Sequence, residues 1–298
     1  MRSVLVLAAL TFVLFTTTLS AAGNGYRDPQ YMVDARWLST GLEADNLLIL
    51  DARGPIAYKK GHIQGAIPVK WQDFAVTLGR PGSPKWGVAL NFRELASKFG
   101  EVGVNESSTV VVYGNSLGGW GEDGRFIWML RMIGIKRSMF LNGGFPYWKE
   151  NGYPVVRGKV EPVPVLFKVK NMVPGLSVDT DWIRDNRENI RIVDSRTPEE
   201  YEGARKYGEA RGGRLPGAVL VPYLSLFLED GRLKPQEELE SLFTKAGIGR
   251  DETIAAYCTA GIRSAFMVLA LKMAGFTNSA NYDQSFYRWA ALKELPVE

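Results

Sequence analysis

The sequence predicts an α/β protein with two similar domains, each an open, mainly parallel β-sheet flanked by helices. Two observations predict this fold class. Short apolar strands alternate with amphipathic helices along the 298 residues, and the same order of signals occurs twice, which indicates a duplicated unit. Corresponding landmarks of the two halves lie 141 to 144 positions apart, namely Asp51 and Asp194, Tyr113 and Tyr257, and Trp148 and Trp289.

In the first half, the expected strands are short apolar runs, and the expected helices carry apolar residues at helical spacing. Asp34 precedes the first helix, where an aspartate is a typical start signal. The elements expected here are a helix from 34, a strand at 47–51, a turn at 61–68, a helix at 92–99, a strand at 109–113 and a short aromatic helix around 148.

The second half repeats this order, and Gly275 follows the helix expected at 264–274 as a C-terminal cap. The expected elements are a helix around 181–184, a strand at 190–194, a turn at 213–220, a helix at 236–246, a strand at 253–257, a helix at 264–274 and a short aromatic helix around 289. Prolines at 154, 162, 164 and 174 keep the segment between the halves extended. We therefore predict domains at 23–153 and 179–298, joined by a connector at 154–178.

The N-terminal segment has the pattern of a cleavable signal peptide. Arg2 supplies a positive charge, residues 4–15 are almost entirely apolar, and Ser20 and Ala22 are small residues at the −3 and −1 positions of a cleavage site. The apolar run is shorter than the roughly 20 residues that span a bilayer, and an uncleaved anchor is the alternative. We expect a signal peptide at 1–22, a periplasmic or secreted protein, and no stable membrane insertion after cleavage.

The composition is that of a globular protein and narrows the choice of partners. Hydrophobic residues make up 46% of the chain and charged residues 23%. The net charge of +4, with no long basic run, says little about nucleic-acid or membrane partners and mildly favours small anionic substrates. We expect no nucleic-acid partner. The single histidine, His62, cannot build a histidine-based metal site, and the single cysteine, Cys258, cannot form an intramolecular disulfide.

The segment around Cys258 carries the chemistry. Cys258 follows an apolar strand and precedes a helix, which is where open α/β sheets place their ligands. Gly261 permits a tight curl of the loop, so that the backbone N–H groups of residues 259–263 can surround one sulfur atom. The helix N-terminus and an inward-pointing Arg263 would lower the pKa of the thiol and hold a persulfide or a bound anion. The alternatives are a buried structural cysteine and an Arg263 solvated on the first helical turn.

These motifs together resemble the rhodanese family, and most of all the tandem-domain thiosulfate/mercaptopyruvate sulfurtransferases, from about residue 33 to residue 295. The resemblance rests on five features in this order: an Asp-Xaa-Arg after the first inner strand of each half (Asp51-Ala52-Arg53 and Asp194-Ser195-Arg196), the pair Gly61-His62-Ile63-Gln64-Gly65-Ala66 and Gly213-Arg214-Leu215-Pro216-Gly217-Ala218, the strand Val111-Val112-Tyr113, the segment Leu141-Asn142-Gly143-Gly144-Phe145, and the Cys258 loop.

The resemblance implies a division of labour. Gly114 stands where the first domain would carry its cysteine, so that domain should be catalytically inactive and serve as a structural and interface partner. Cys258 matches the family's nucleophile, which takes the outer sulfur of a donor as a persulfide and passes it to a thiophilic acceptor. Arg196 matches an arginine near the substrate, with a purely structural salt bridge as its alternative. The substrate-binding residues expected beside Cys258 are Arg263, Arg196, Thr259, Ala260, Gly261, Ile262 and Ser264.

The resemblance also implies the partners. The loop looks like the Cys-Xaa4-Arg loops of many bacterial rhodaneses, and Arg263 favours a compact anion, so thiosulfate is expected as donor ahead of 3-mercaptopyruvate. A thiol or cyanide is the expected acceptor, no metal or organic cofactor is implied, and a monomer is the default.

Some other prominent residues are expected to be structural. We expect the following to stabilise the fold: Asp51, Asp194, Trp148 and Trp289. Residues 118–121 are not expected to bind phosphate.

Two other classes of function compete with this interpretation. Cysteine-dependent phosphatases and arsenate reductases place five residues between the cysteine and the arginine, whereas only four separate Cys258 from Arg263. The shorter loop should fit a sulfur atom better than a phosphate group. A sulfur carrier or protein-interaction module without turnover is the second alternative, because a fold does not fix a function.

Overall fold

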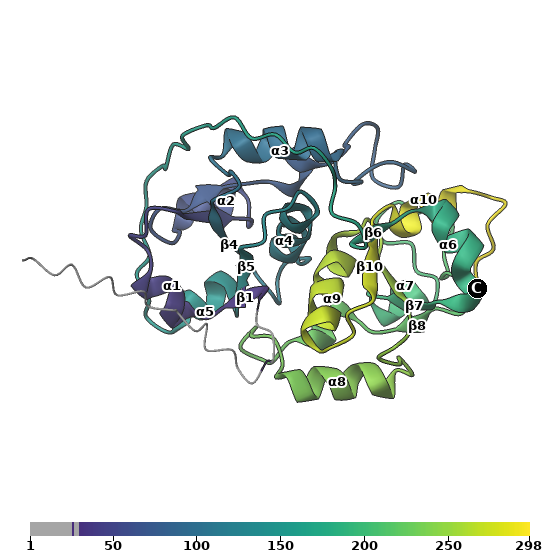
Figure 1. Cartoon of the computed structure of the whole chain (residues 1–298). Helices are drawn as coiled ribbons and strands as arrows, with labels where there is room; N and C mark the ends of the chain where they lie inside the picture. The colour runs from purple at the N-terminus through teal and green to yellow at the C-terminus, as the bar shows by residue number, and fades with distance from the viewer. Residues whose placement is uncertain (1–25, 27–29) are drawn as a thin grey trace, which may run out of the picture.

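The structure is a computed structural model and describes residue 26 and residues 30–298 of the chain. It has two lobes, each built on a sheet of five parallel strands with helices on its faces (Figure 1). The predicted fold class is therefore confirmed. The predicted signal peptide at 1–22 lies outside the described residues. Within the part of the chain that is described, no helix is both long and apolar enough to span a bilayer.

The N-terminal sheet has the strand order β1-β5-β4-β2-β3, so each strand beyond the first is reached by a crossover through a helix. Its elements in chain order are β1 (Met32–Val33), α1 (Ala35–Thr40), β2 (Leu47–Asp51), α2 (Pro55–Lys60), β3 (Ile67–Pro68), a 3₁₀ turn η1 (Trp71–Phe74), α3 (Phe92–Glu101), β4 (Thr109–Tyr113), α4 (Glu122–Met132), β5 (Ser138–Leu141) and α5 (Gly144–Glu150).

The C-terminal sheet repeats this arrangement as β6-β10-β9-β7-β8. Its elements are β6 (Ser177–Val178), α6 (Thr180–Asn186), η2 (Arg187–Asn189), β7 (Arg191–Asp194), α7 (Pro198–Tyr201), β8 (Val219–Leu220), η3 (Tyr223–Leu226), α8 (Gln236–Lys245), β9 (Ile254–Tyr257), α9 (Ile262–Met273), β10 (Ser279–Tyr282) and α10 (Ser285–Ala291). Both residues of β6 lie within the connector predicted at 154–178, and both pair with β10.

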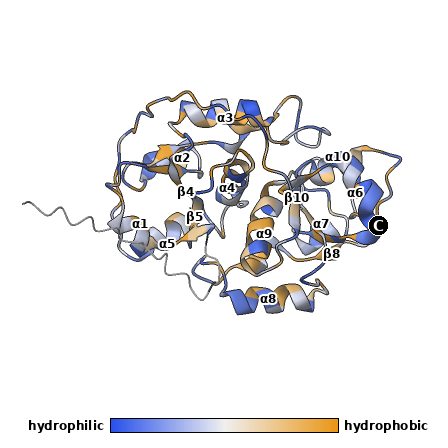
Figure 2. Cartoon of the chain, viewed as in Figure 1, coloured by the Kyte–Doolittle hydropathy of each residue, from blue (hydrophilic) through white to orange (hydrophobic). Residues whose placement is uncertain are grey.

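Two long helices, α4 and α9, pack against each other between the two sheets (Figure 1). Every residue of α9 except Lys272 is buried, and Figure 2 shows this helix as largely hydrophobic. Such a helix is apolar all round because it is covered on every side. The helix begins two residues earlier than predicted, since Gly261 adopts a left-handed conformation (φ 77°) and is itself the N-cap.

The closing helices of the two domains are held in the same way. Trp148 and Trp289 are fully buried, and their indole N–H groups donate to the carbonyls of Pro154 and Pro296 at 2.8 and 2.7 Å. The indole ring fills the core while its one donor is satisfied by the backbone. The prediction that both tryptophans are structural is consistent with these contacts.

Candidate active site

Cys258 lies directly after β9, a central strand of the C-terminal sheet, and four residues before Ile262, where α9 begins. Its backbone is fixed by the start of α10. The amide of Cys258 donates to Ser285 Oγ at 3.1 Å, and the amide of Phe286 donates to the Cys258 carbonyl at 3.0 Å. Ser285 is the single non-glycine residue with positive φ (50°) among the described residues. The cysteine is therefore held on a rigid loop at the carboxyl edge of the sheet.

The loop can curl tightly only because residue 261 is glycine. Its φ of 77° is left-handed, and a Cβ atom there would lie 2.4 Å from the Asp283 carbonyl oxygen. Asn281 Nδ2 donates to the Gly261 carbonyl at 3.2 Å and anchors the outer side of the curl. Both the backbone angle and the close approach require glycine.

The surroundings of Cys258 favour the thiolate. Burial by itself would raise the pKa of the thiol, which is only 1% exposed. The Arg263 guanidinium, the amide and hydroxyl groups of Ser264 and the amide of Ala260 outweigh burial and lower the pKa of Cys258. Ser264 Oγ lies 3.6 Å from the sulfur. A lowered pKa increases the fraction of Cys258 present as thiolate, which is the nucleophilic form of a cysteine.

Arg263 points inward and is almost fully buried, so the alternative of a solvated side chain is wrong. Its two terminal nitrogens donate to the two carboxylate oxygens of Glu200, each at 2.7 Å, and Thr259 Oγ1 also donates to Glu200 at 2.7 Å. Burial would raise the pKa of Glu200, but the bonds from Arg263 and Thr259 lower it to about 2. Most of the Arg263 charge is therefore compensated by a carboxylate that the sequence analysis missed.

A sequence signal for Glu200 existed, although it pointed to a different role. Thr197-Pro198-Glu199-Glu200 matches the capping-box pattern, and both of its reciprocal hydrogen bonds form at the start of α7. The same carboxylate thus caps a short helix and holds Arg263. Nothing in the local pattern shows the second partner, because Arg263 lies 63 positions further along the chain.

The structure holds Arg196 against its own strand, and the residue lines a hollow that shares Trp120, Tyr207 and Arg263 with the Cys258 cavity. It pairs with Asp194 at 2.7 Å, donates to the Gly213 carbonyl at 2.8 Å and stacks over the Phe286 ring at 4.1 Å. Its side chain is fully buried and does not line the cavity that Cys258 faces. These contacts match the structural alternative for Arg196 and give no contact with a substrate in that cavity.

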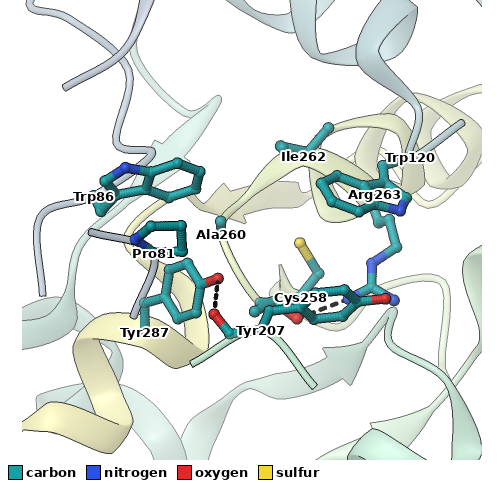
Figure 3. Close-up of a pocket in the computed structure, with 10 residues that line it drawn as sticks. Pro81, Trp86, Trp120, Tyr207, Cys258, Ala260, Ile262, Arg263 and Tyr287 are labelled. Carbon is teal, nitrogen blue, oxygen red and sulfur yellow. Dashed lines mark hydrogen bonds between the residues drawn. The ribbon is translucent and has the colours of Figure 1, made fainter. Parts of the chain in front are cut away.

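Cys258 opens into a cavity of about 290 Å³ between the two domains (Figure 3). Of the predicted site residues, Cys258, Thr259, Ala260, Ile262 and Arg263 line it, whereas Gly261 and Ser264 support the loop from behind. The remaining lining residues were not predicted and are mostly aromatic, namely Pro81, Trp86, Trp120, Tyr207 and Tyr287. Figure 3 shows the sulfur pointing into the space between these side chains.

The N-terminal domain contributes part of this cavity and also supports the loop. Arg125 of α4 is fully buried, pairs with Asp283 at 2.7 Å and donates to the Gly87 carbonyl at 2.5 Å. Asp283 accepts a second hydrogen bond, at 2.7 Å, from the amide of Ala89. This buried pair joins α4, the 87–89 segment and the turn behind Gly261. These contacts fit the expectation of a structural and interface partner, whereas the residues that this domain supplies to the cavity lining were not predicted.

The first domain lacks a nucleophile at the matching position. Gly114 follows β4 as Cys258 follows β9, and Gly121 (φ 79°) caps α4 as Gly261 caps α9. The carboxyl group of Asp123 occupies the space in front of Gly114, since a Cβ there would lie 3.0 Å from its Cγ. Burial raises the pKa of Asp123 to about 7. Among the described residues, no three His, Cys, Asp or Glu side chains gather as a metal site would require.

Two parallel five-stranded sheets, with a single buried cysteine at the carboxyl edge of the second, define a duplicated α/β protein. The rhodanese-like domain family matches this chain twice, at residues 34–151 and 179–292. The chain therefore belongs to the rhodanese-like domain family, and the resemblance seen in the motifs is confirmed.

Relatives over most of the chain agree with this assignment. A thiosulfate sulfurtransferase of Azotobacter vinelandii is 32% identical over 264 residues, covering 88% of this chain and 94% of the relative. The sulfur carrier protein TtuD of Thermus thermophilus is 28% identical over 288 residues, covering 92% and 98%. These names support a sulfurtransferase activity at the level of the family.

A solved structure shares the fold. The anaerobic ergothioneine biosynthesis enzyme of Chlorobium limicola, in complex with trimethyl histidine, superposes with a TM-score of 0.80 at 24% identity, covering 90% of this chain and 70% of that one. At this identity the likeness extends to the arrangement of strands and helices. It does not extend to the substrate.

Proposed function

We propose that this protein is a sulfurtransferase that carries sulfane sulfur as a persulfide on Cys258, taking it from an anionic donor of the thiosulfate kind. The observation that carries the proposal is the buried Cys258 thiol, whose pKa is lowered by Arg263 and the loop amides and which faces a cavity large enough for a donor. In the proposed reaction the thiolate attacks the outer sulfur, the bond between the two donor sulfurs breaks, and sulfite leaves with the electron pair.

The loop then stabilises the persulfide anion through the same groups that stabilise the thiolate. A thiol or cyanide takes the terminal sulfur and returns Cys258 to the thiolate. Arg263 and Thr259 act as one unit with Glu200 and hold the shape of the loop, while we assign Arg196 to the fold. The four-residue spacing between Cys258 and Arg263 also supports a sulfur atom over a phosphate group.

The test is the intact mass of the purified protein before and after thiosulfate, with Cys258→Ser as the control. A gain of one sulfur atom on the native chain alone, reversed by cyanide with release of thiocyanate, is the expected result. A gain with 3-mercaptopyruvate but not with thiosulfate would keep the persulfide and change the donor. No gain with either donor would contradict the proposal.

A sulfur carrier without turnover is the second candidate, and the name of the Thermus thermophilus relative favours it. The two candidates differ in the fate of the persulfide. An enzyme releases thiocyanate over many cycles when donor and cyanide are both in excess, whereas a carrier of this kind holds its sulfur until a partner protein removes it. Export to the periplasm or beyond stays a prediction from the N-terminal sequence, and a fusion of residues 1–22 to a reporter tests it.

A further inference from the structure

The buried pair of Arg125 and Asp283 lies directly behind the Cys258 loop. Arg125 Nη1 donates to Asp283 Oδ1 at 2.7 Å and makes a longer hydrogen bond, at 3.5 Å, to the Ala260 carbonyl. A Cβ atom on Gly261 would lie 2.5 Å from Asp283 Oδ1 and 3.0 Å from Arg125 Nη1. A residue of the cysteine-free domain therefore packs against the outer side of the loop, and it is not one of the residues that line the cavity.

Two carbonyl groups of the loop are held on this outer side. The Ala260 carbonyl accepts from Arg125, and the Gly261 carbonyl accepts from Asn281 Nδ2 at 3.2 Å. In a planar trans peptide the N–H group points away from the carbonyl of the preceding residue. The amides of Gly261 and Ile262 are therefore directed to the inner side of the loop, where the sulfur lies. Holding the Ala260 carbonyl outward thus directs an amide towards the sulfur.

The duplication shows which part of this arrangement the fold itself needs. Asn142 follows β5 as Asp283 follows β10, and each side chain accepts from a backbone amide of the opposite domain. Asn142 Oδ1 accepts from Leu233 at 2.8 Å, and Asp283 Oδ2 accepts from Ala89 at 2.7 Å. The hydrogen bond between the domains is therefore made by an amide side chain as well as by a carboxylate.

The ion pair is present only behind the loop that carries the cysteine. Arg125 of α4 is matched by Ala265 of α9, since each is the fourth residue after the glycine that caps its helix. The Nδ2 atom of Asn142 is buried and has no hydrogen-bond partner within the described part of the chain, whereas the matching atom of Asp283 is held by Arg125. A buried ion pair is also a poor source of stability, because taking two charges out of water costs about as much as their attraction returns. The fold therefore does not account for the pair.

We infer that Arg125, supplied by the domain that has no cysteine, is a positioning residue for the reaction at Cys258. Through the Ala260 carbonyl it keeps loop amides directed at the sulfur, and so stabilises the thiolate before sulfur transfer and the persulfide anion after it. Asp283 in turn fixes the guanidinium, which also donates to the Gly87 carbonyl at 2.5 Å. The persulfide part of this inference rests on the proposed function, and the thiolate part does not.

The variant that tests the inference gives the second domain the arrangement of the first. Asp283→Asn combined with Arg125→Met removes both charges and keeps an acceptor for the Ala89 amide, as Asn142 does in the other half. This double variant should unfold closer to the native urea midpoint than Arg125→Met alone, which leaves a carboxylate buried without its cation. The reactivity of its folded state is then measured.

Two rates on Cys258 are followed by mass: alkylation by iodoacetamide across a range of pH, and persulfide formation from thiosulfate at neutral pH. The alkylation midpoint of the double variant should lie about one pH unit or more above the native midpoint, because hydrogen bonds to the thiolate favour it over the thiol. Persulfide formation should slow about tenfold or more, as expected for losing a hydrogen bond to a charged group. Arg131→Met, on the same helix but bonded to Ser138 of β5, should leave both at their native values.

The outcomes separate this inference from the proposed function. A native alkylation midpoint or a native rate of persulfide formation in the folded double variant overturns the inference. A double variant that loses as much stability as Arg125→Met also overturns it, because the pair would then serve the fold. The persulfide mechanism stands in all these cases. If neither thiosulfate nor 3-mercaptopyruvate adds sulfur to the native protein, the proposed function fails, while a raised alkylation midpoint in the double variant still supports the positioning role of Arg125.

Discussion

A single methyl group at Gly261 tests the architecture of the site. In Gly261→Ala, the left-handed φ of 77° would cost about 1–2 kcal/mol for any residue with a Cβ. The new Cβ would also lie 2.4 Å from the carbonyl oxygen and 2.5 Å from Oδ1 of Asp283, and 3.0 Å from Arg125 NH1. These atoms belong to a buried ion pair and to backbone, and such overpacking costs about 1–3 kcal/mol. We expect a total loss of about 2–5 kcal/mol in the free energy of unfolding.

Gly217→Ala is the matched control. Gly217 has a similar φ of 72°, is exposed, and has no atom within 4 Å of the position a Cβ would take. It should lose only the conformational part, about 1–2 kcal/mol. Urea denaturation followed by tryptophan fluorescence measures both losses. The Gly261 variant should also form persulfide at least tenfold more slowly, because the curl that holds the sulfur opens. Equal stability and equal rates in the two variants would refute the reasoning.

Three further predictions concern charges. Arg263→Gln removes the cation that lowers the Cys258 pKa. The midpoint of the pH profile for alkylation by iodoacetamide should therefore lie at higher pH than in the native protein. An unchanged midpoint would contradict this prediction. Arg125→Met leaves the buried Asp283 carboxylate without its cation and should cost about 3–5 kcal/mol in the free energy of unfolding. Arg184→Ala, which breaks exposed ion pairs, should leave the denaturation midpoint nearly unchanged. Similar midpoints for the two variants would contradict the contrast. The pKa of Glu200 is lowered from 4.5 to about 2. Its ionised carboxylate should therefore contribute about 3 kcal/mol to the free energy of unfolding above pH 4.5, and this contribution is lost as the pH falls towards 2. Glu200→Gln should remove this pH dependence from the acid side of the stability curve.

The sequence predicted the fold well because its signals are local and occur twice. The strands β2 and β4 have the predicted bounds, since each is a continuous apolar run with clear ends. Helix bounds were less accurate. The start of α9 was missed by two residues because a left-handed glycine can serve as N-cap, which the apolar periodicity does not show.

The part of the candidate site that lies close together in the sequence was predicted, because its signals are local. Cys258, Gly261 and Arg263 lie within six residues, so their order along the chain already indicates a tight loop around the sulfur atom. Glu200 and Trp120 reach the site from far along the chain, and only the packing of α4 against α9 brings Trp120 to the cavity. Local pattern carries no information about such contacts.

The duplication supplies an internal comparison that separates residues of the fold from residues of the site. Arg53 pairs with Asp51, donates to the Gly61 carbonyl at 2.8 Å and stacks over the Phe145 ring. Arg196 makes the same three kinds of contact at the matching position. The first domain has these contacts although it contains no cysteine.

A contact that both domains make does not distinguish the domain that has the cysteine from the domain that lacks it. The Arg263–Glu200 pair has no such counterpart, because Asp123 stands where the first domain would place that arginine. Arg263 is the basic group that lowers the pKa of Cys258, and the contacts of the arginine after the first inner strand are common to both domains.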